Sequence, residues 1–531
     1  MLTGGAGSGK TQLLCKKLIS ESSQISCLVV TRLPRLLSMV KNHVEKERDI
    51  RNITFLSYDD LMAELAFKVQ APEGGKRRFA VFSQVQFGDV SSTGENATIS
   101  FAQEFMNVYL TVKERKRMKA SKVEALTLFT AIRTIKSNSR CLEKLEPLSR
   151  DTYMQLPDAF GLDQDQRALV FELFEQYQEW GQLEIQSGTK PTALLHLEIR
   201  CIVDEAQDFS ELDLNLFVRM SRSVKSALFA ADGAQSVEIG LNMRKGTVHD
   251  VLHASIFDRK GLHVKDVLQT IQTKINHRTH EQNLRLSKAV RNMMTRSFQV
   301  PGTQEHALIT GKLPQVLTIS GMEDLKNESI FRAANIVFLC PDEMVQDVKS
   351  FFVRSQISCD VFGVREAKGL EYDSVALFQF FDYFDRRKDL GEAWRNALRW
   401  MFSKTGVTAM SSNEWFMGKP LDSCDYLLSH PELQDQAAMW YTAITRARNR
   451  LYLIEVGGGG RGLGDYAFRC LTDKSLALAE RVEFIDEGFK EMTPQQHKAR
   501  GVQLVTQAFS LSREKKPFPQ VKPGAFCPRE G

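Results

Sequence analysis

The chain has 531 residues, of which 43% are hydrophobic and 25% charged, which is the composition of an ordinary globular protein. This length exceeds what one hydrophobic core serves, so we expect roughly three to four domains or one large enzyme with insertions. The net charge of +5 permits a nucleic-acid partner, but over this length it is too diffuse to indicate one.

The nine cysteines are scattered, form no CxxC pair and have no histidine nearby at metal-ligand spacing. This usage indicates a reducing compartment and supports neither a disulfide framework nor a zinc site. No apolar run approaches the roughly eighteen residues that a membrane span needs, and the N-terminus has no signal-peptide segment. We therefore expect an intracellular protein, nuclear or cytoplasmic, without membrane contact.

The sequence GGAGSGKT at positions 4–11 matches the pattern G-x-x-x-x-G-K-[ST]. In such a loop the backbone N–H groups turn inward around nucleotide phosphates, which requires glycine where φ is positive or where a Cβ would collide. The lysine would contact the β- and γ-phosphates, and the threonine would bind Mg²⁺. The candidate residues for binding ATP are Gly4, Gly5, Ala6, Gly7, Ser8, Gly9, Lys10 and Thr11. Because the pattern is short, a glycine-rich loop with an incidental lysine is the alternative.

Only Met1, Leu2 and Thr3 precede this loop, whereas a phosphate loop normally follows a complete buried strand. Either the sequence starts at an internal methionine, or a shorter strand than usual holds the loop. We favour the first explanation. In both cases the affinity for ATP depends on how well the short segment supports the loop.

The next segments alternate between helical and β-branched patterns. A helix is predicted to about residue 19, a strand at 26–31, a helix at 36–47, a strand at 52–57 and a helix at 59–67. Such alternation predicts a parallel sheet with helices on both faces, and it puts the phosphate loop at the carboxyl edge, where ligands bind.

Between residues 70 and 190 the apolar residues recur at helical spacing, which predicts an inserted, mostly helical subdomain. It contains the basic run KERKRMK at 113–119. This run could contact phosphates or act as a nuclear address, but we favour the interpretation that it is a solvated helix face.

The sheet pattern resumes at EIRCIVDEAQD, residues 198–208, an apolar strand that ends in acids. Asp204 at the strand tip would hold Mg²⁺ through water, and Glu205 would orient and deprotonate the attacking water. A further strand in ALFAADGAQ, residues 227–235, ends in Asp232 and Gln235. Gln235 is a candidate for sensing the γ-phosphate.

With these motifs the chain resembles the superfamily 1 helicases of the UvrD/Rep type. QNLR at 282–285 is similar to their NYR motif, AKGLEYDSV at 367–375 to the KGLEF motif, and YTAITRAR at 441–448 to the TRA motif. The similarity spans the chain to about residue 456 but is strong only at the motifs. QSVEIGLNMR at 235–244 and ITGKLP at 309–314 resemble one branch, the UvrD-like domain of eukaryotic TPR and ankyrin repeat-containing protein 1-like proteins.

The resemblance implies two RecA-like P-loop NTPase lobes with ATP and Mg²⁺ in the cleft between them. It implies that Arg285 and Arg446 are arginine fingers from the second lobe and that Glu371 holds the ribose. For each arginine, a surface salt bridge is the alternative. It also implies ATP-driven action on single-stranded DNA or RNA.

Two departures from the family pattern concern base selectivity and phosphate contact, and two others, together with the absence of a large second-lobe insertion, favour a rival hypothesis. Leu284 stands where the NYR motif has its adenine-packing tyrosine, and Arg365 replaces the histidine usual before the KGLE motif. Glu238 and Gly240 stand where the family has base-stacking aromatics, each of which contributes roughly 1–3 kcal/mol to single-strand binding. The rival is a nucleotide-gated interaction module within a larger repeat protein, without unwinding activity.

The predicted domain plan has six parts, and it leaves the oligomeric state open. The first lobe comprises residues 1–69 and 191–262 and is interrupted by the helical insertion 70–190. The second lobe is 263–456, with an insert at 382–430 whose tryptophans we expect in helix packing. A glycine linker at 457–464 matches G-x-G-x-x-G, but no second βαβ unit follows, so we reject a dinucleotide site. A helical repeat-like segment at 465–513, a possible contact for protein partners, precedes a disordered tail at 514–531.

Overall fold

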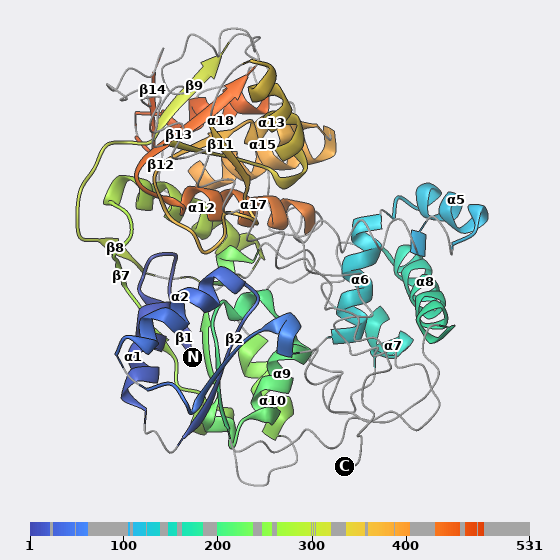
Figure 1. Cartoon of the computed structure of the whole chain (residues 1–531). Coiled ribbons are helices and arrows are strands. Elements are labelled where there is room, and N and C mark those ends of the chain that lie inside the picture. The colour runs from blue at the N-terminus through green and yellow to red at the C-terminus, as the bar shows by residue number, and fades with distance from the viewer. Residues whose placement is uncertain are drawn as a thin grey trace, which may run out of the picture.

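The chain folds into two α/β lobes and a separate helical subdomain (Figure 1). A computed structural model describes residues 1–61, 105–183, 199–319, 336–403 and 431–482, with short gaps inside these ranges. Each lobe contains a six-stranded sheet whose neighbouring strands all pair in parallel. This confirms the predicted fold class of two RecA-like lobes with parallel sheets.

The first sheet carries helices on both faces. Its strands lie in the order β3 (Ile53–Ser57), β2 (Ser26–Thr31), β4 (Ile199–Val203), β5 (Leu228–Ala231), β1 (Leu2–Thr3) and β6 (Ile271–Gln272). One core packs α1 (Lys10–Ser20) and α2 (Pro34–Glu45) against the sheet, and a second core packs α9 (Glu211–Met220) and α10 (Thr247–Ile256) on the other face. The short α11 (Val264–Val267) follows. The central strands β2 and β4 are mostly apolar, and their last residues are buried, because both faces of the sheet are covered there.

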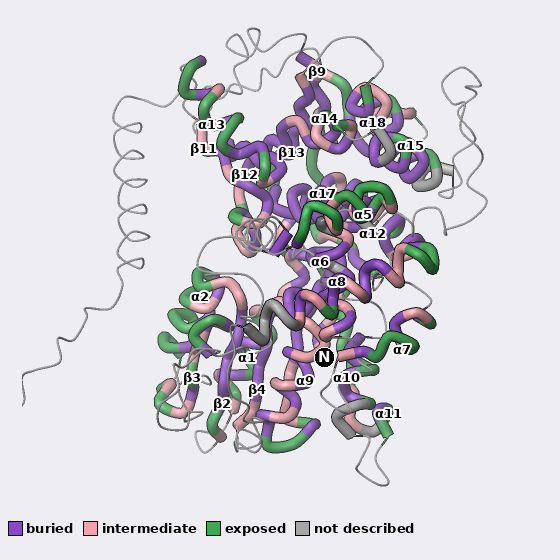
Figure 2. Tube along the Cα trace, turned by 90° about the vertical axis from the view of Figure 1, so that its right-hand side faces the viewer, coloured by how far each residue is buried: buried purple, intermediate pink, exposed green. Residues whose placement is uncertain are grey.

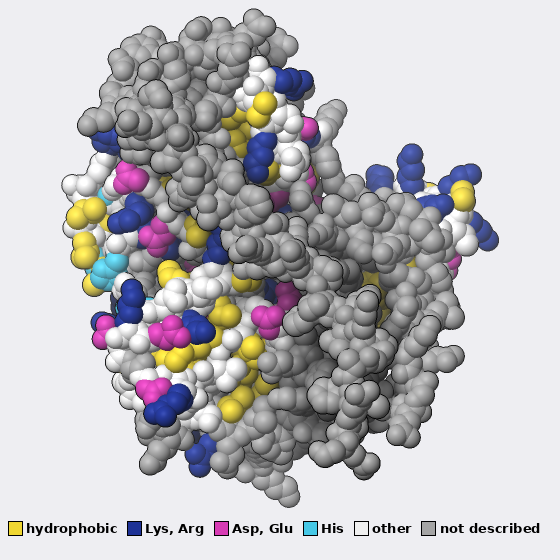
Figure 3. Space-filling model, viewed as in Figure 1, with side chains coloured by type: hydrophobic (Ala, Val, Ile, Leu, Met, Phe, Trp, Pro, Cys, Tyr) yellow, Lys and Arg dark blue, Asp and Glu magenta, His cyan; other side chains and the backbone are white. Residues whose placement is uncertain are grey.

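The helical subdomain enters the chain between β3 and β4 and lies beside the first lobe (Figure 1). Its helices are α5 (Val112–Ala120), α6 (Ala125–Ser137), α7 (Arg150–Met154) and α8 (Gln164–Leu183). They pack around a core of their own, to which α5 contributes Met118. Figure 3 shows the Lys and Arg side chains of α5 gathered at the outer edge of the subdomain, so most of the basic run faces solvent.

The second lobe repeats the layered plan. Its strands lie in the order β11 (Asp360–Gly363), β10 (Ile336–Cys340), β12 (Tyr372–Phe378), β13 (Ala447–Val456), β9 (Gln315–Ile319) and β14 (Glu480–Arg481). One face carries α12 (Glu281–Phe298), α14 (Phe380–Asp385), α15 (Lys388–Ser403), α17 (Pro431–Ile444) and α18 (Leu463–Leu471), and the other carries α13 (Val345–Arg354). Figure 2 shows buried residues along the strands of both lobes.

A connecting segment joins the lobes. After β6, the strand β7 (Ile275–Asn276) pairs in parallel with β8 (His306–Ala307), away from both large sheets. This segment runs past the loop that follows β1, because His277 N–H donates to Gly7 O over 2.9 Å. The start of α12 is therefore anchored close to the phosphate loop.

The boundary predicted at the end of the second lobe is wrong. Residues 463–482 are not a linker followed by a separate repeat, because α18 packs in the second-lobe core through Phe468 and Leu471. The strand β14 then extends the second sheet by pairing with β9. The apolar residues of α18 lie on one helical face, and covering the sheet buries that face.

Several other predictions lie outside the described residues. They concern Glu238 and Gly240, the insert beyond residue 403, the helical segment from 483 to 513 and the tail at 514–531. None of the helices that the structure describes is both long and apolar enough to traverse a bilayer.

Candidate active site

The loop between β1 and α1 closes around the side chain of Lys10. Its Nζ donates to Gly4 O over 2.9 Å and to Gly5 O over 2.8 Å, and only 8% of the residue is exposed. Gly7 and Gly9 have φ values of 78° and 82°, which favour glycine at both positions. The sequence folds this way locally because α1 begins at Lys10, directly after the left-handed Gly9. The loop therefore presents a cation and a helix N-terminus at the edge of the sheet.

Two oxygen ligands suited to a divalent cation meet beside this loop. Thr11 Oγ1 donates a hydrogen bond of 2.7 Å to Asp204 Oδ2, at the tip of β4. Burial, and next the charge of Glu205, raise the pKa of Asp204 to about 7, although Thr11 opposes this shift. A cation at this point would offset the cost of burying the carboxylate. The hydroxyl and the carboxylate are hard oxygen donors of the kind that Mg²⁺ prefers, so the residues present fit that ion.

Glu205 is held in an uncommon backbone conformation. Its φ of 54° and ψ of 46° lie in the left-handed region, which costs a residue with a side chain roughly 1–3 kcal/mol. Gln207 Nε2 donates to the Glu205 carboxylate, and Gln207 Oε1 accepts from Asp232 N–H over 2.9 Å. Strained backbone of this kind is found often at functional positions. The Glu205 side chain is oriented by its hydrogen bond from Gln207.

Gln235 links the two lobes directly. Its Nε2 donates to Asp232 Oδ2 over 2.6 Å, and its Oε1 accepts from Arg446 Nη2 over 2.6 Å. Arg446 is 1% exposed, and burial, followed by the charge of Arg278, lowers its pKa to about 10. The predicted pair Gln235 and Arg446 is thus brought together at the lobe interface.

The hydrogen bonds of Arg285 do not place its side chain at this interface. Its Nη2 donates to Leu476 O over 2.7 Å and its Nη1 to Gln282 Oε1 over 3.2 Å, both within the second lobe. Leu284 beside it is buried in the helix packing of α12. The assignment of QNLR at 282–285 as the NYR-like motif therefore does not agree with the geometry.

Arg278, which the sequence reasoning missed, lies against the phosphate loop instead. A Cβ at Gly7 would collide with the Cβ of Arg278. Arg278 Nε donates to Glu371 Oε1 over 2.8 Å, so the residue predicted to hold the ribose lies within the same group. The signal was present, because Asn276, His277 and Arg278 spell N-x-R with an aromatic ring in the middle.

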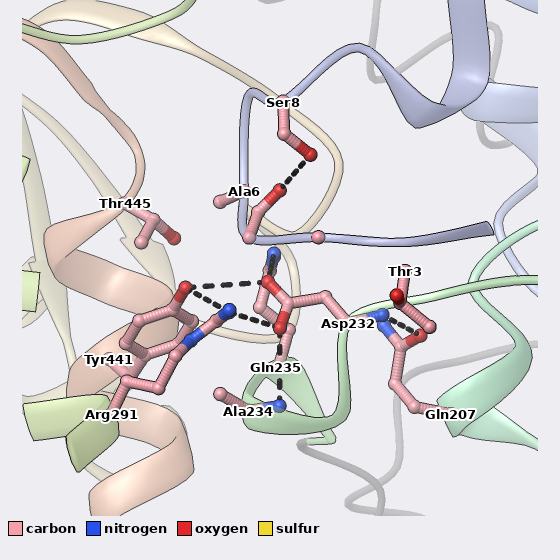
Figure 4. Close-up of polar contacts among 12 residues, drawn as sticks. Thr3, Ala6, Ser8, Gln207, Asp232, Ala234, Gln235, Arg291, Tyr441 and Thr445 are labelled. Carbon is pink, nitrogen blue, oxygen red and sulfur yellow. Dashed lines mark hydrogen bonds and ion pairs between the residues drawn. The ribbon is translucent and has the colours of Figure 1, made fainter. Parts of the chain in front are cut away.

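Buried ion pairs cross the interface next to these residues. Lys368 Nζ of the second lobe pairs with Asp208 and donates to Gln235 O over 2.7 Å. Arg291 of α12 contacts both Asp232 and the hydroxyl of Tyr441 (Figure 4). Although burial raises the pKa of Asp232, the charge of Arg291 brings that pKa below its usual value. These pairs hold the two lobes together around the strand tips of the first sheet.

Glu305 supports the base of the loop from the side of the second lobe. Its carboxylate accepts from Gly5 N–H, and Arg291 Nη1 lies 3.4 Å from Glu305 Oε1. A Cβ at Gly5 would collide with this carboxylate, so the approach requires glycine. The first turn of the loop is thereby fixed by a group 300 residues away in the chain.

The sheets and the loop define a class of protein: a two-lobed α/β protein with a parallel six-stranded sheet in each lobe and a glycine-rich loop facing the lobe interface. No protein-family model matches the chain. A curated relative, TPR and ankyrin repeat-containing protein 1 of Homo sapiens, is 26% identical over 326 residues. The match covers 56% of this chain and 11% of the human protein, so the chain spans about a tenth of that relative's length. This similarity agrees with the branch that the motifs indicate.

Two solved structures are also similar. The C-terminal domain of a possible DNA helicase from Lactobacillus plantarum WCFS1 has 14% identity and a TM-score of 0.21, covering 38% of this chain and 97% of that one. The PRRSV helicase has 10% identity and a TM-score of 0.31, covering 97% of this chain and 67% of that one.

Proposed function

We propose that the chain hydrolyses ATP with Mg²⁺ between its two lobes and uses the energy to move along or unwind single-stranded nucleic acid. Lys10 and the loop amides would bind the β- and γ-phosphates, and Thr11 and Asp204 would hold the metal ion. When bound, Mg²⁺ neutralises charge on the phosphate oxygens. Glu371, which contacts Arg278, would bind the ribose.

In the hydrolysis step, Glu205 accepts a proton from the attacking water. The water oxygen bonds to the γ-phosphorus while the bond from that phosphorus to the bridging oxygen of ADP breaks. Negative charge on the transferring group increases, and the guanidinium groups of Arg278 and Arg446 would stabilise it. Gln235 would couple binding of the γ-phosphate to the position of Arg446 through the hydrogen bond between them.

The observation that carries this proposal is the convergence of cations from two lobes. Lys10 comes from the first lobe, whereas Arg278 touches the loop at Gly7 and Arg446 reaches Gln235 from the second. Measuring Mg²⁺-dependent phosphate release tests it. The Lys10→Ala variant should lose turnover while its thermal unfolding stays close to that of the unaltered chain, and undiminished turnover would refute the site.

The nucleic-acid part of the proposal is supported by the resemblance of AKGLEYDSV at 367–375 and YTAITRAR at 441–448 to motifs of the UvrD/Rep-type helicases. Single-stranded DNA or RNA should raise the ATPase rate and should be retained on the protein in an ATP-dependent way. If neither polymer changes the ATPase rate, the hydrolysis proposal stands. The proposed movement along nucleic acid is then wrong, and the nucleotide-gated interaction module becomes the proposed function.

A further inference from the structure

We propose that Asn276 is a positioning residue that shapes the phosphate loop and delivers Arg278 to it through one side chain. The expected effect on ATP hydrolysis rests on the proposed function. The expected effect on the shape of the loop and the turn does not. Asn276 is 3% exposed and belongs to the segment that connects the lobes.

The first half of the argument is the contact with the loop. Asn276 Nδ2 donates a hydrogen bond of 2.7 Å to Ala6 O, and the neighbouring His277 N–H donates to Gly7 O over 2.9 Å. In a planar trans peptide the C=O and N–H groups point in opposite directions. Holding the Ala6 carbonyl toward the connecting segment therefore turns the Gly7 N–H the other way, which is the orientation that a phosphate-binding loop needs.

The second half is the contact with the turn that carries the arginine. Asn276 Oδ1 accepts from the backbone N–H groups of Arg278 and Thr279, both over 3.0 Å. This is the local turn that asparagine forms with the residues following it. The main chain of Arg278 is thus fixed by Asn276, while its side chain is held by Glu371 and by Thr445 O.

The Asn276 amide makes both kinds of contact, as a donor to the loop and as an acceptor from the turn. Neither aspartate nor alanine can make both. Aspartate keeps the acceptor for the turn but presents an oxygen, rather than a donor, to Ala6 O. Alanine removes both contacts. A displacement of about 1 Å in a group that acts on the transition state can cost on the order of 10²-fold in rate, so a small shift of Arg278 would be measurable.

A double-mutant cycle on the full chain tests the inference. We expect Asn276→Ala to lower kcat for ATP on the order of 10²-fold because Arg278 shifts, and to raise KM because the loop loses its contact at Ala6 O. In the Arg278→Ala background the same substitution should have little further effect on kcat, because that effect acts through the arginine, whereas the rise in KM should persist. Losses that multiply in the double variant, or an unchanged kcat in Asn276→Ala, would overturn the proposal.

The second measurement is amide hydrogen exchange, which does not depend on hydrolysis. In Asn276→Ala, exchange should rise both in the loop at 4–9 and in the turn at 276–279, and in Asn276→Asp it should rise in the loop alone, whereas the exposed Asn42→Asp on α2 should change neither segment. If the unaltered chain shows no ATPase but Asn276→Ala loosens both segments, the proposed function fails and the positioning role stands. If exchange in both segments stays the same, the positioning role fails whatever the ATPase rate.

Discussion

Arg446 and Gln235, one from each lobe, share a hydrogen bond of 2.6 Å in a buried interface. Gln235 also contacts Asp232 at the end of β5, so the amide joins the arginine to the strand tips of the first sheet. Any change that moves Gln235 must therefore either move the buried guanidinium of Arg446 or leave it without this hydrogen bond. Gln235 is therefore one of the side chains that couple the two lobes, together with the pairs Lys368–Asp208 and Arg291–Asp232.

The Gln235–Arg446 contact leads to the first prediction. Arg446→Lys keeps the positive charge but loses the planar group that reaches both Gln235 and Leu370 O. We expect kcat for ATP to fall on the order of 10³-fold, within the range of arginine-finger losses, while nucleotide binding changes little. Phosphate release and equilibrium binding of a fluorescent ATP analogue check this, and an equal loss in both quantities would contradict the assigned role.

Glu205 gives a second prediction, which separates binding from chemistry. Glu205→Gln keeps the size of the side chain and its contact with Gln207 but removes the proton acceptor. We expect turnover to fall about 10²–10⁴-fold with ATP affinity retained. Single-turnover experiments with radiolabelled ATP measure both quantities. A variant that still turns over at the original rate would mean that another group takes the proton.

The buried pair between Arg291 and Asp232 predicts a large effect on stability. Arg291→Met leaves the Asp232 carboxylate buried without that guanidinium, and breaking a buried pair from one side costs about 3–5 kcal/mol. Denaturant unfolding measures the loss. Arg354→Met on the exposed face of α13 is the matched control and should lie within about 0.5 kcal/mol of the unaltered chain. Equal stability of the two variants would contradict the role of the pair.

Glu455 predicts a pH dependence far from the phosphate loop. It is buried and accepts from the N–H groups of Phe381 and Asp382, yet burial raises its pKa to about 8. The native chain therefore binds this proton more tightly than the unfolded chain does. The contribution of this group to stability falls as pH rises from the ordinary glutamate value through about 8.

The Glu455→Gln variant isolates that contribution. The difference in free energy of unfolding between the unaltered chain and the variant should shrink as pH rises from 5 to 8, by at most about 1.4 kcal/mol per pH unit. Denaturant melts at four pH values give the slope. A difference that stays constant with pH would show that the carboxyl does not titrate in this range.

The sequence predicts the strands of the central sheets well, because a strand buried on both faces is mostly apolar. Val29 and Val203, for example, lie in short apolar runs rich in β-branched residues, which favour a strand. The position of the glycine-rich loop, Asp204 and Gln235 at one edge was predictable for a related reason: each follows such a strand directly, and parallel strands bring their carboxyl ends to one edge.

The remaining features depend on contacts that are distant in sequence. A three-residue pattern such as N-x-R occurs near both Arg278 and Arg285, and only the approach to Gly7 distinguishes the two. Glu305 carries no local signal at all, because its role is defined by Gly5 some 300 residues earlier. The second-lobe position of α18 was missed because the preceding glycines resemble a linker, whereas Phe468 packs into a core that the sequence does not reveal.

The most direct test of the account compares two arginines that lie seven residues apart. Steady-state Mg²⁺-dependent ATP hydrolysis is measured for the unaltered chain, Arg278→Ala and Arg285→Ala, with thermal unfolding of each as the control for folding. If cations from both lobes act on one triphosphate, Arg278→Ala should lose at least about 10³-fold in kcat and Arg285→Ala should stay near the original rate. The reverse order, or full activity of Arg278→Ala, would contradict the central claim.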